Sequence, residues 1–142
     1  LDQLVEKRVN PQKIFLTGFS AGGWTSLMMM DELEKKFNSA IVFAPAFAGP
    51  RREIKKYPRW RKIERPRQVK EMIKAKIIKA LIFAYEDDAF NRPQELNFLK
   101  EKYSASIKLI GYECGKGHST VDEDCKIKKT KEIIKNYFQN SK

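Results

Sequence analysis

The sequence of 142 residues has no apolar run that approaches the ~20 residues needed to cross a bilayer, so we expect no membrane span. Residues 1–12 lack the charged and apolar regions of a signal peptide, so we expect a soluble chain, with the cytoplasm slightly favoured. The chain contains one histidine, two cysteines and no C-x-x-C pair. This is a poor ligand set for a metal, and we expect neither a metal nor a cofactor.

Four short apolar runs are present, and they alternate with segments of helical spacing. The runs are residues 13–17, 40–44, 80–85 and 107–112. Continuous apolar runs are typical of strands in a parallel sheet that is buried on both faces. We predict an α/β fold in one domain, residues 1–142: a three-layer sandwich with a mostly parallel sheet of about four strands and helices on both faces.

Helices are predicted between and after these runs. Residues 21–37 carry apolar side chains at helical spacing. A second helix has Pro93 in its first turn, with Asn91 as a candidate N-cap. Residues 120–123 have a capping-box pattern that opens the last helix. The buried face of that helix is predicted to hold Ile127, Ile133, Ile134, Tyr137 and Phe138.

Residues 18–22 have the pattern G-x-S-x-G, between the first apolar run and a helical segment. In a nucleophile elbow the serine occupies a strained strand-to-helix turn, and the residues beside it must be small, as Gly18 and Gly22 are. The following helix contributes its dipole and the backbone N–H of Ala21, which stabilise charge on an attacked carbonyl oxygen. Ser20 is the candidate nucleophile and Ala21 the candidate oxyanion donor. The alternative is a Gly/Ser-rich turn that caps a helix.

A catalytic serine needs a base, and the base needs an acid that orients it. The single histidine, His118, lies in a glycine-containing loop after the fourth apolar run. The third run is followed by two aspartates, Asp87 and Asp88. A carboxylate at a strand end can accept the Nδ1–H of the imidazole and fix its tautomer. The candidates follow the chain order Ser, Asp, His.

This order, with each residue just past a strand, resembles the α/β-hydrolase fold family over residues 13–139. The resemblance implies that Ser20 is the nucleophile, His118 the general base and Asp87 the acid. Asp87 is preferred because the family usually places its acid a few residues beyond a small residue that ends the strand, and Ala84 is that residue.

Asp88 stays open as the alternative acid. Two adjacent aspartates also fit a solvated turn, and a single histidine also fits a surface position. The joint placement of the three residues at strand ends favours the catalytic interpretation. Residues 18–23, with a second glycine, are most similar to the dienelactone-hydrolase and carboxylesterase branches of the family.

Members of that family normally have eight strands, with the elbow after the fifth. The resemblance therefore implies that this chain holds strands five to eight and lacks the N-terminal half, which would supply the second oxyanion N–H. The strand at residues 13–17 would then lose a neighbour, and an unpaired apolar edge is a template for association. We expect a piece of a longer hydrolase, or a minimal relative that oligomerises through this edge.

Residues 51–79 contain thirteen Lys and Arg and three Glu, which gives +10 of the net charge of +11. Interleaved Tyr57 and Trp60 allow a nucleic-acid interface, but an apolar face at helical spacing favours a helix with a solvated lysine face. In the family that this chain resembles, the corresponding connection, here residues 49–79, often forms a lid. Such a lid would favour anionic substrates through Arg51, Arg52, Arg59 and Arg61.

Cys114 and Cys125 flank the loop that contains His118. A disulfide between them would tie this loop to the last helix and imply an oxidising compartment, either secreted or periplasmic. Two free thiols in a reducing cytosol are the other possibility, and the sequence leaves both open.

The sequence thus predicts a serine hydrolase that cleaves a small carboxylic ester through a Ser20–His118–Asp87 triad and an acyl-enzyme. Esterase, thioesterase and peptidase chemistry remain open. The rival hypothesis is a non-catalytic α/β module that binds an acidic partner through its basic segment.

Overall fold

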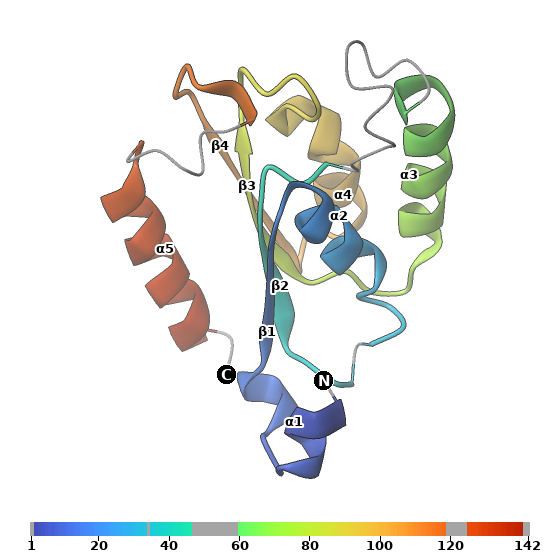
Figure 1. Ribbon diagram of the computed structural model, residues 1–142, viewed down its shortest axis with the longest axis vertical. Coiled ribbons are helices and arrows are strands. Elements are labelled where there is room, and N and C mark those ends of the chain that lie inside the picture. Colours follow the sequence, from blue (N-terminus) through green and yellow to red (C-terminus); the bar gives the residue numbers. More distant parts are fainter. Residues whose placement is uncertain (1, 34, 47–59, 119–124, 141–142) are drawn as a thin grey trace.

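The computed structural model describes residues 2–33, 35–46, 60–118 and 125–140 (Figure 1). The strands are β1 (Phe15–Phe19), β2 (Ser39–Phe43), β3 (Ala80–Tyr85) and β4 (Ile107–Tyr112). The α-helices are α1 (Asp2–Glu6), α2 (Ser20–Met28), α3 (Arg65–Lys74), α4 (Asn97–Lys102) and α5 (Ile127–Asn140). Short 3₁₀ and π turns form η1 (Pro11–Lys13), η3 (Trp60–Glu64) and η4 (Pro93–Leu96).

The four strands form one parallel sheet in the order β1-β2-β3-β4. The runs predicted at residues 80–85 and 107–112 match β3 and β4, whereas β1 starts two residues later than predicted and continues to Phe19. In a parallel sheet the carboxyl ends of all strands meet at the same edge. Ser20, Asp88 and His118 all follow carboxyl ends of strands, so the topology gathers the predicted site residues at this edge.

Helices cover both faces of the sheet, as Figure 1 shows, with α2, α3 and α4 on one side and α5 on the other. One core cluster joins the first face to these three helices through the buried side chains of Trp24, Leu27, Met72, Leu96 and Leu99. A second cluster, on the opposite face, packs against Ile133, Ile134 and Tyr137 of α5. The predicted α/β class, with a parallel sheet of four strands between helical layers, is confirmed.

Two predicted helix boundaries are wrong. Helix α2 ends at Met28 instead of continuing to residue 37. Just beyond it, Asp31 Oδ1 accepts hydrogen bonds from the backbone N–H groups of Lys76 and Ile77, 2.8 and 3.2 Å away. The segment after α2 is therefore shaped by a contact with the residues between α3 and β3, which lie far away in sequence.

The second error concerns Asn91, which is fully buried and does not cap the helical segment that follows. The N-cap is Arg92, whose backbone N–H donates to Glu95 Oε2 at 2.9 Å. On α5, Ile127 and Phe138 are 37 and 44% exposed, so both ends of the predicted buried face are only partly covered.

Several predictions lie outside the described residues. These are the capping box at residues 120–123, three of the four lid arginines and residues 49–59 of the basic connection. Within the described part of the chain, each helix is too short or too polar to cross a lipid bilayer.

Candidate active site

Ser20 occupies a strained turn between β1 and α2. Its φ angle is +51°, a left-handed conformation that residues other than glycine rarely adopt. Its backbone carbonyl accepts a hydrogen bond from Ala46 N, 3.0 Å away, in the loop that follows β2. Because this hydrogen bond fixes the backbone of the turn, the hydroxyl of Ser20 is held at the carboxyl edge of the sheet.

The turn needs small residues, but not both of those predicted. A Cβ atom on Gly18 would lie 2.5 Å from the carbonyl carbon of Gly22 and 2.6 Å from the nitrogen of Gly23. A Cβ atom on Gly23 would lie 3.0 Å from the oxygen of Gly18. Gly22 has open space where its Cβ would be. Gly18 and Gly23 therefore meet the steric requirement of the turn, and the sequence argument that named Gly22 is wrong on this point.

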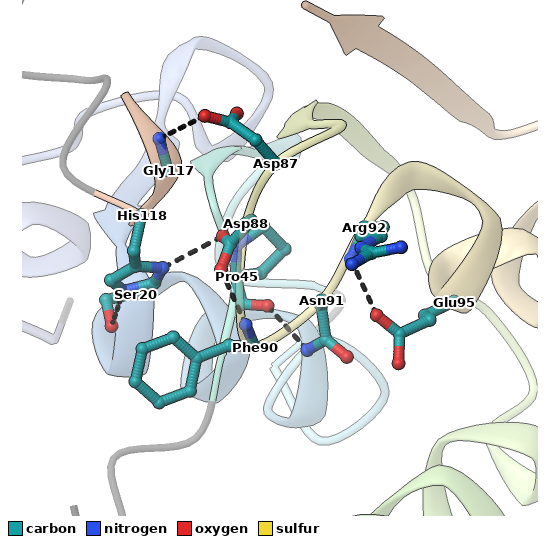
Figure 2. Close-up of polar contacts among 10 residues, drawn as sticks. All are labelled: Ser20, Pro45, Asp87, Asp88, Phe90, Asn91, Arg92, Glu95, Gly117 and His118. Carbon is teal, nitrogen blue, oxygen red and sulfur yellow. Dashed lines mark hydrogen bonds and ion pairs between the residues drawn. The ribbon is translucent and has the colours of Figure 1, made fainter. Parts of the chain in front are cut away.

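A chain of hydrogen bonds joins Ser20, His118 and Asp88 (Figure 2). Ser20 Oγ lies 2.7 Å from His118 Nε2, and His118 Nδ1 lies 2.9 Å from Asp88 Oδ2. An ionised carboxylate only accepts hydrogen bonds, so Nδ1 carries the proton and Nε2 is left to accept the proton of the serine hydroxyl.

The carboxylate beside His118 belongs to Asp88, so the preference for Asp87 is wrong. The side chain of Asp87 is exposed and accepts a hydrogen bond from the backbone N–H of Gly117 instead. The Ala84 spacing fails because Tyr85 still pairs with Tyr112, so β3 ends one residue later than that spacing assumes. Only one of the two adjacent carboxylates therefore faces the histidine.

Asp88 is held in a dry position by its own turn. Its side chain is fully buried, and Oδ1 accepts a hydrogen bond of 2.7 Å from the backbone N–H of Phe90. Its backbone N–H donates to the carbonyl of Tyr85, 3.1 Å away.

Burial, with smaller contributions from Tyr112 and the negative charge of Asp88, raises the pKa of Tyr85 to about 12.

A network of polar side chains stabilises the turn after β3, which contains Asp88. Asn91 Nδ2 donates to the carbonyl of Pro45 at 2.9 Å, and Asn91 Oδ1 accepts from Arg65 Nε at 2.8 Å. The Arg65 guanidinium also donates to the carbonyl of Glu95. The network connects the start of α3, the turn after β3 and the loop after β2. No local sequence signal identifies this role of Asn91, because its two partners, Pro45 and Arg65, are distant in sequence.

Two aromatic rings lie beside the imidazole of His118. The ring centroid of Phe90 is 4.4 Å from that of His118, and the centroid of Phe19 is 5.1 Å from it. Phe19 directly precedes Ser20, and Phe90 follows Asp88 by two residues. The sequence analysis did not identify either phenylalanine, although both lie within two residues of a predicted site residue.

Ala21 is the second residue of α2, where a backbone N–H has no acceptor within the helix. Together with the positive end of the helix dipole, this placement suits a developing negative charge next to Ser20.

The histidine loop is closed by a disulfide between Cys114 and Cys125, whose Cα atoms are 6.1 Å apart. The structure thus selects the paired cysteines from the two possibilities left open by the sequence. Among the described residues, no group of three or more His, Cys, Asp or Glu side chains is placed to hold a metal ion.

No protein-family model and no curated protein sequence matches this chain. Three solved structures resemble it at low sequence identity. An α/β hydrolase enzyme from the metagenome of sediments from the lagoon of Mar Chica, Morocco, is 12% identical with a TM-score of 0.58. The thioesterase domain from the curacin biosynthetic pathway is 13% identical with a TM-score of 0.52, and the S-formylglutathione hydrolase of Staphylococcus aureus is 15% identical with a TM-score of 0.59.

The similarity extends over 98, 84 and 99% of this chain, respectively. The chain spans only 66, 64 and 56% of the length of those structures. At these identities the comparison establishes architecture and leaves activity open. The sheet order, the strained serine turn and these neighbours together show that the chain has the α/β-hydrolase fold.

Proposed function

We propose that this chain carries a serine hydrolase site that cleaves carboxylic esters through an acyl-enzyme. The proposal rests mainly on one observation, the hydrogen-bond chain from Ser20 Oγ through His118 to the buried carboxylate of Asp88. A serine hydroxyl is a weak nucleophile at neutral pH unless a base removes its proton.

In the proposed reaction, His118 Nε2 takes the proton of Ser20 as Oγ attacks the ester carbonyl. Asp88 keeps the proton on Nδ1 and stabilises the imidazolium that forms. The carbonyl oxygen becomes an oxyanion, to which the backbone N–H of Ala21 donates. His118 then protonates the leaving group, and water hydrolyses the acyl-enzyme by the same steps in reverse order.

An oxyanion hole usually has more than one donor, and the loss of one typically lowers the rate by on the order of 10²–10³. Ala21 is one donor, and we place the other outside the described residues, in the N-terminal half that the family resemblance implies. We therefore propose that full activity belongs to a longer protein of which this chain is a part.

The finer class of substrate is also part of the proposal. Residues 18–23 resemble the dienelactone-hydrolase and carboxylesterase branches. Two of the structural neighbours are named as a thioesterase domain and as an S-formylglutathione hydrolase. We therefore propose oxygen esters as the main substrates and thioesters as the alternative, because both leave through an atom that His118 can protonate.

A fluorophosphonate probe tests the nucleophile directly. We expect the probe to label wild-type protein at Ser20 and to give no label with Ser20→Ala. Ser26→Ala is the matched control, since Ser26 belongs to the same helix and its hydroxyl donates to the carbonyl of Gly22, 2.8 Å away. Labelling that persists in Ser20→Ala, or that is lost in Ser26→Ala, would contradict the assignment.

The rival function, binding of an acidic partner, draws on the exposed basic side chains of α3. Arg67 and Lys74 are 63 and 62% exposed, but each lies within about 3 Å of a glutamate on or next to the same helix. These ion pairs reduce the charge available to a partner. Salt-sensitive binding to an acidic peptide that Arg67→Glu weakens, in a protein that the fluorophosphonate does not label, would favour the rival.

A further inference from the structure

Apolar surface is exposed next to the proposed nucleophile. Phe19, at the end of the edge strand β1, is 39% exposed, and Phe90 is half-buried. Phe19 ends β1 and Phe90 belongs to the turn after β3, so the two rings reach the imidazole of His118 from strands on either side of β2. In Figure 2 the ring of Phe90 lies beside His118, while its backbone N–H points to Asp88.

The position of His118 decides which part of an ester would contact these rings. In the tetrahedral intermediate, the oxyanion faces Ala21 N–H and the leaving atom must come within hydrogen-bond distance of His118 Nε2, which protonates it. The acyl chain occupies the remaining direction. Because both phenylalanines contact the imidazole, the group attached to the leaving atom is the part of the substrate nearest to them.

We propose that Phe19 and Phe90 form the binding surface for the leaving group, and that this surface selects esters of aromatic or bulky apolar alcohols. The inference rests on the proposed hydrolase function and adds the class of leaving group to it. Aromatic groups pack on phenylalanine rings at centroid distances of about 4.5–7 Å, and the gain exceeds that from burial of apolar area alone.

The chemical step determines which rate constant reports on this surface. In acylation, the Ser20 Oγ–carbon bond forms, the bond from carbon to the leaving oxygen breaks, and that oxygen receives the proton held on His118 Nε2. In deacylation the alcohol has already departed, so its identity no longer affects the rate. The value of kcat/KM covers the steps through acylation and is therefore the quantity to measure.

The experiment varies the two halves of the ester separately. Wild-type protein, Phe90→Ala and Phe19→Leu are assayed with 1-naphthyl acetate and 2,2,2-trifluoroethyl acetate, which differ only in the leaving group. They are then assayed with 1-naphthyl acetate and 1-naphthyl hexanoate, which differ only in the acyl chain. The ratio of kcat/KM within each pair, compared between variant and wild type, cancels the intrinsic reactivity of the esters.

Phe138→Ala serves as the matched control, because Phe138 is an exposed phenylalanine on α5 that packs on Phe15. Phe90→Leu keeps most of the apolar volume in case Phe90→Ala does not fold, and thermal unfolding of each variant verifies the fold.

We expect Phe90→Ala to lower the preference for the naphthyl over the trifluoroethyl leaving group by about three- to tenfold. Phe19→Leu and Phe90→Leu should have smaller effects in the same direction, and Phe138→Ala should have none. The preference for acetate over hexanoate should stay unchanged in all variants.

Three results would overturn the inference while the hydrolase function stands. They are an unchanged leaving-group preference, a change in the acyl-chain preference instead, or an equal loss on all esters, which would mean that the rings only orient His118. A wild-type protein that hydrolyses none of these esters and is not labelled at Ser20 would overturn both the proposed function and the inference.

Discussion

Two turns at the carboxyl edge of the sheet build the candidate site by opposite means. The nucleophile turn, residues 18–23, is formed by close backbone packing, in which the position of Gly18 leaves no room for a Cβ atom. The acid turn, residues 86–91, is held by hydrogen bonds that the side chains of Asp87, Asp88 and Asn91 make with the histidine loop, the loop after β2 and the start of α3. Substitutions that add side-chain atoms should therefore disrupt the first turn, whereas substitutions that remove hydrogen-bonding groups should disrupt the second.

This difference explains why one turn is recognisable from the sequence and the other only in part. A requirement for small residues is local and leaves a short pattern around the serine. A requirement for hydrogen-bond partners depends on how β2, β3 and β4 are arranged, and many polar residues at strand ends would satisfy the same local pattern.

The largest effect is expected for a substitution in the acid turn, and it is an effect on the catalytic rate. Asp88→Asn keeps the shape of the side chain but no longer fixes the proton on His118 Nδ1, so kcat should fall by about 10⁴, as in proteases with the same triad. Asp87→Asn is the control: an asparagine oxygen can still accept from Gly117 N–H, and kcat should fall less than about tenfold. The measurement is steady-state hydrolysis by purified variants. If both changes have mild effects, the triad is refuted.

The next largest effect is expected for a substitution in the nucleophile turn, and it is an effect on the stability of the fold. An alanine Cβ at position 18 would lie 2.5 Å from the backbone of Gly22, so Gly18→Ala should lower the free energy of unfolding by about 1–3 kcal/mol or more. Gly22→Ala should be neutral or should stabilise by up to about 1 kcal/mol, because its Cβ site is open and alanine favours the helix. Urea unfolding of both variants measures the difference, and equal losses would contradict the packing described for Gly18.

Asn91→Ala should break the support of the acid turn without removing a proposed catalytic group. It leaves the carbonyl of Pro45 and the guanidinium of Arg65 with one partner fewer, which should cost about 1–3 kcal/mol. Asn97→Ala, at an exposed asparagine of the same segment, should change stability by less than about 0.5 kcal/mol. Thermal unfolding distinguishes the two, and a tolerated Asn91→Ala would mean that the network is dispensable.

The smallest effect concerns Tyr85, whose pKa is raised from 10.0 to about 12 mainly by burial beneath the acid turn. The neutral phenol is favoured in the folded state, so this contribution to stability is complete below the unfolded pKa of 10.0 and is lost as the pH rises through about 12. Over this pH interval the free energy of unfolding of Tyr85→Phe should therefore fall less steeply than that of the wild-type protein. Asp88→Asn should lower the pKa of Tyr85 slightly, since the Asp88 charge is the smallest of its three causes.

Absorbance titration of the phenolate in wild-type protein and Tyr85→Phe isolates this group. A Tyr85 that ionises at the ordinary value would mean that water reaches the end of β3, and the acid turn would then resemble an open surface loop.

The sequence by itself determined the four strands, the strained serine and the chain order of the site. Continuous apolar runs become strands because only a sheet covered on both faces buries all of their side chains. The parallel direction of the strands then brings the three site segments to one edge. The glycine pattern marks the elbow because steric crowding acts over a few residues.

Only the tertiary structure decided which aspartate faces His118, where α2 ends and what Asn91 contacts. Asp87 and Asp88 are chemically identical neighbours, and the choice between them depends on the pairing of Tyr85 with Tyr112 on β4. The segment after α2 contacts N–H groups that precede β3, and Asn91 bonds a carbonyl after β2. In each case a hydrogen bond spans more than 25 residues, and such a bond leaves no local pattern for the sequence to reveal.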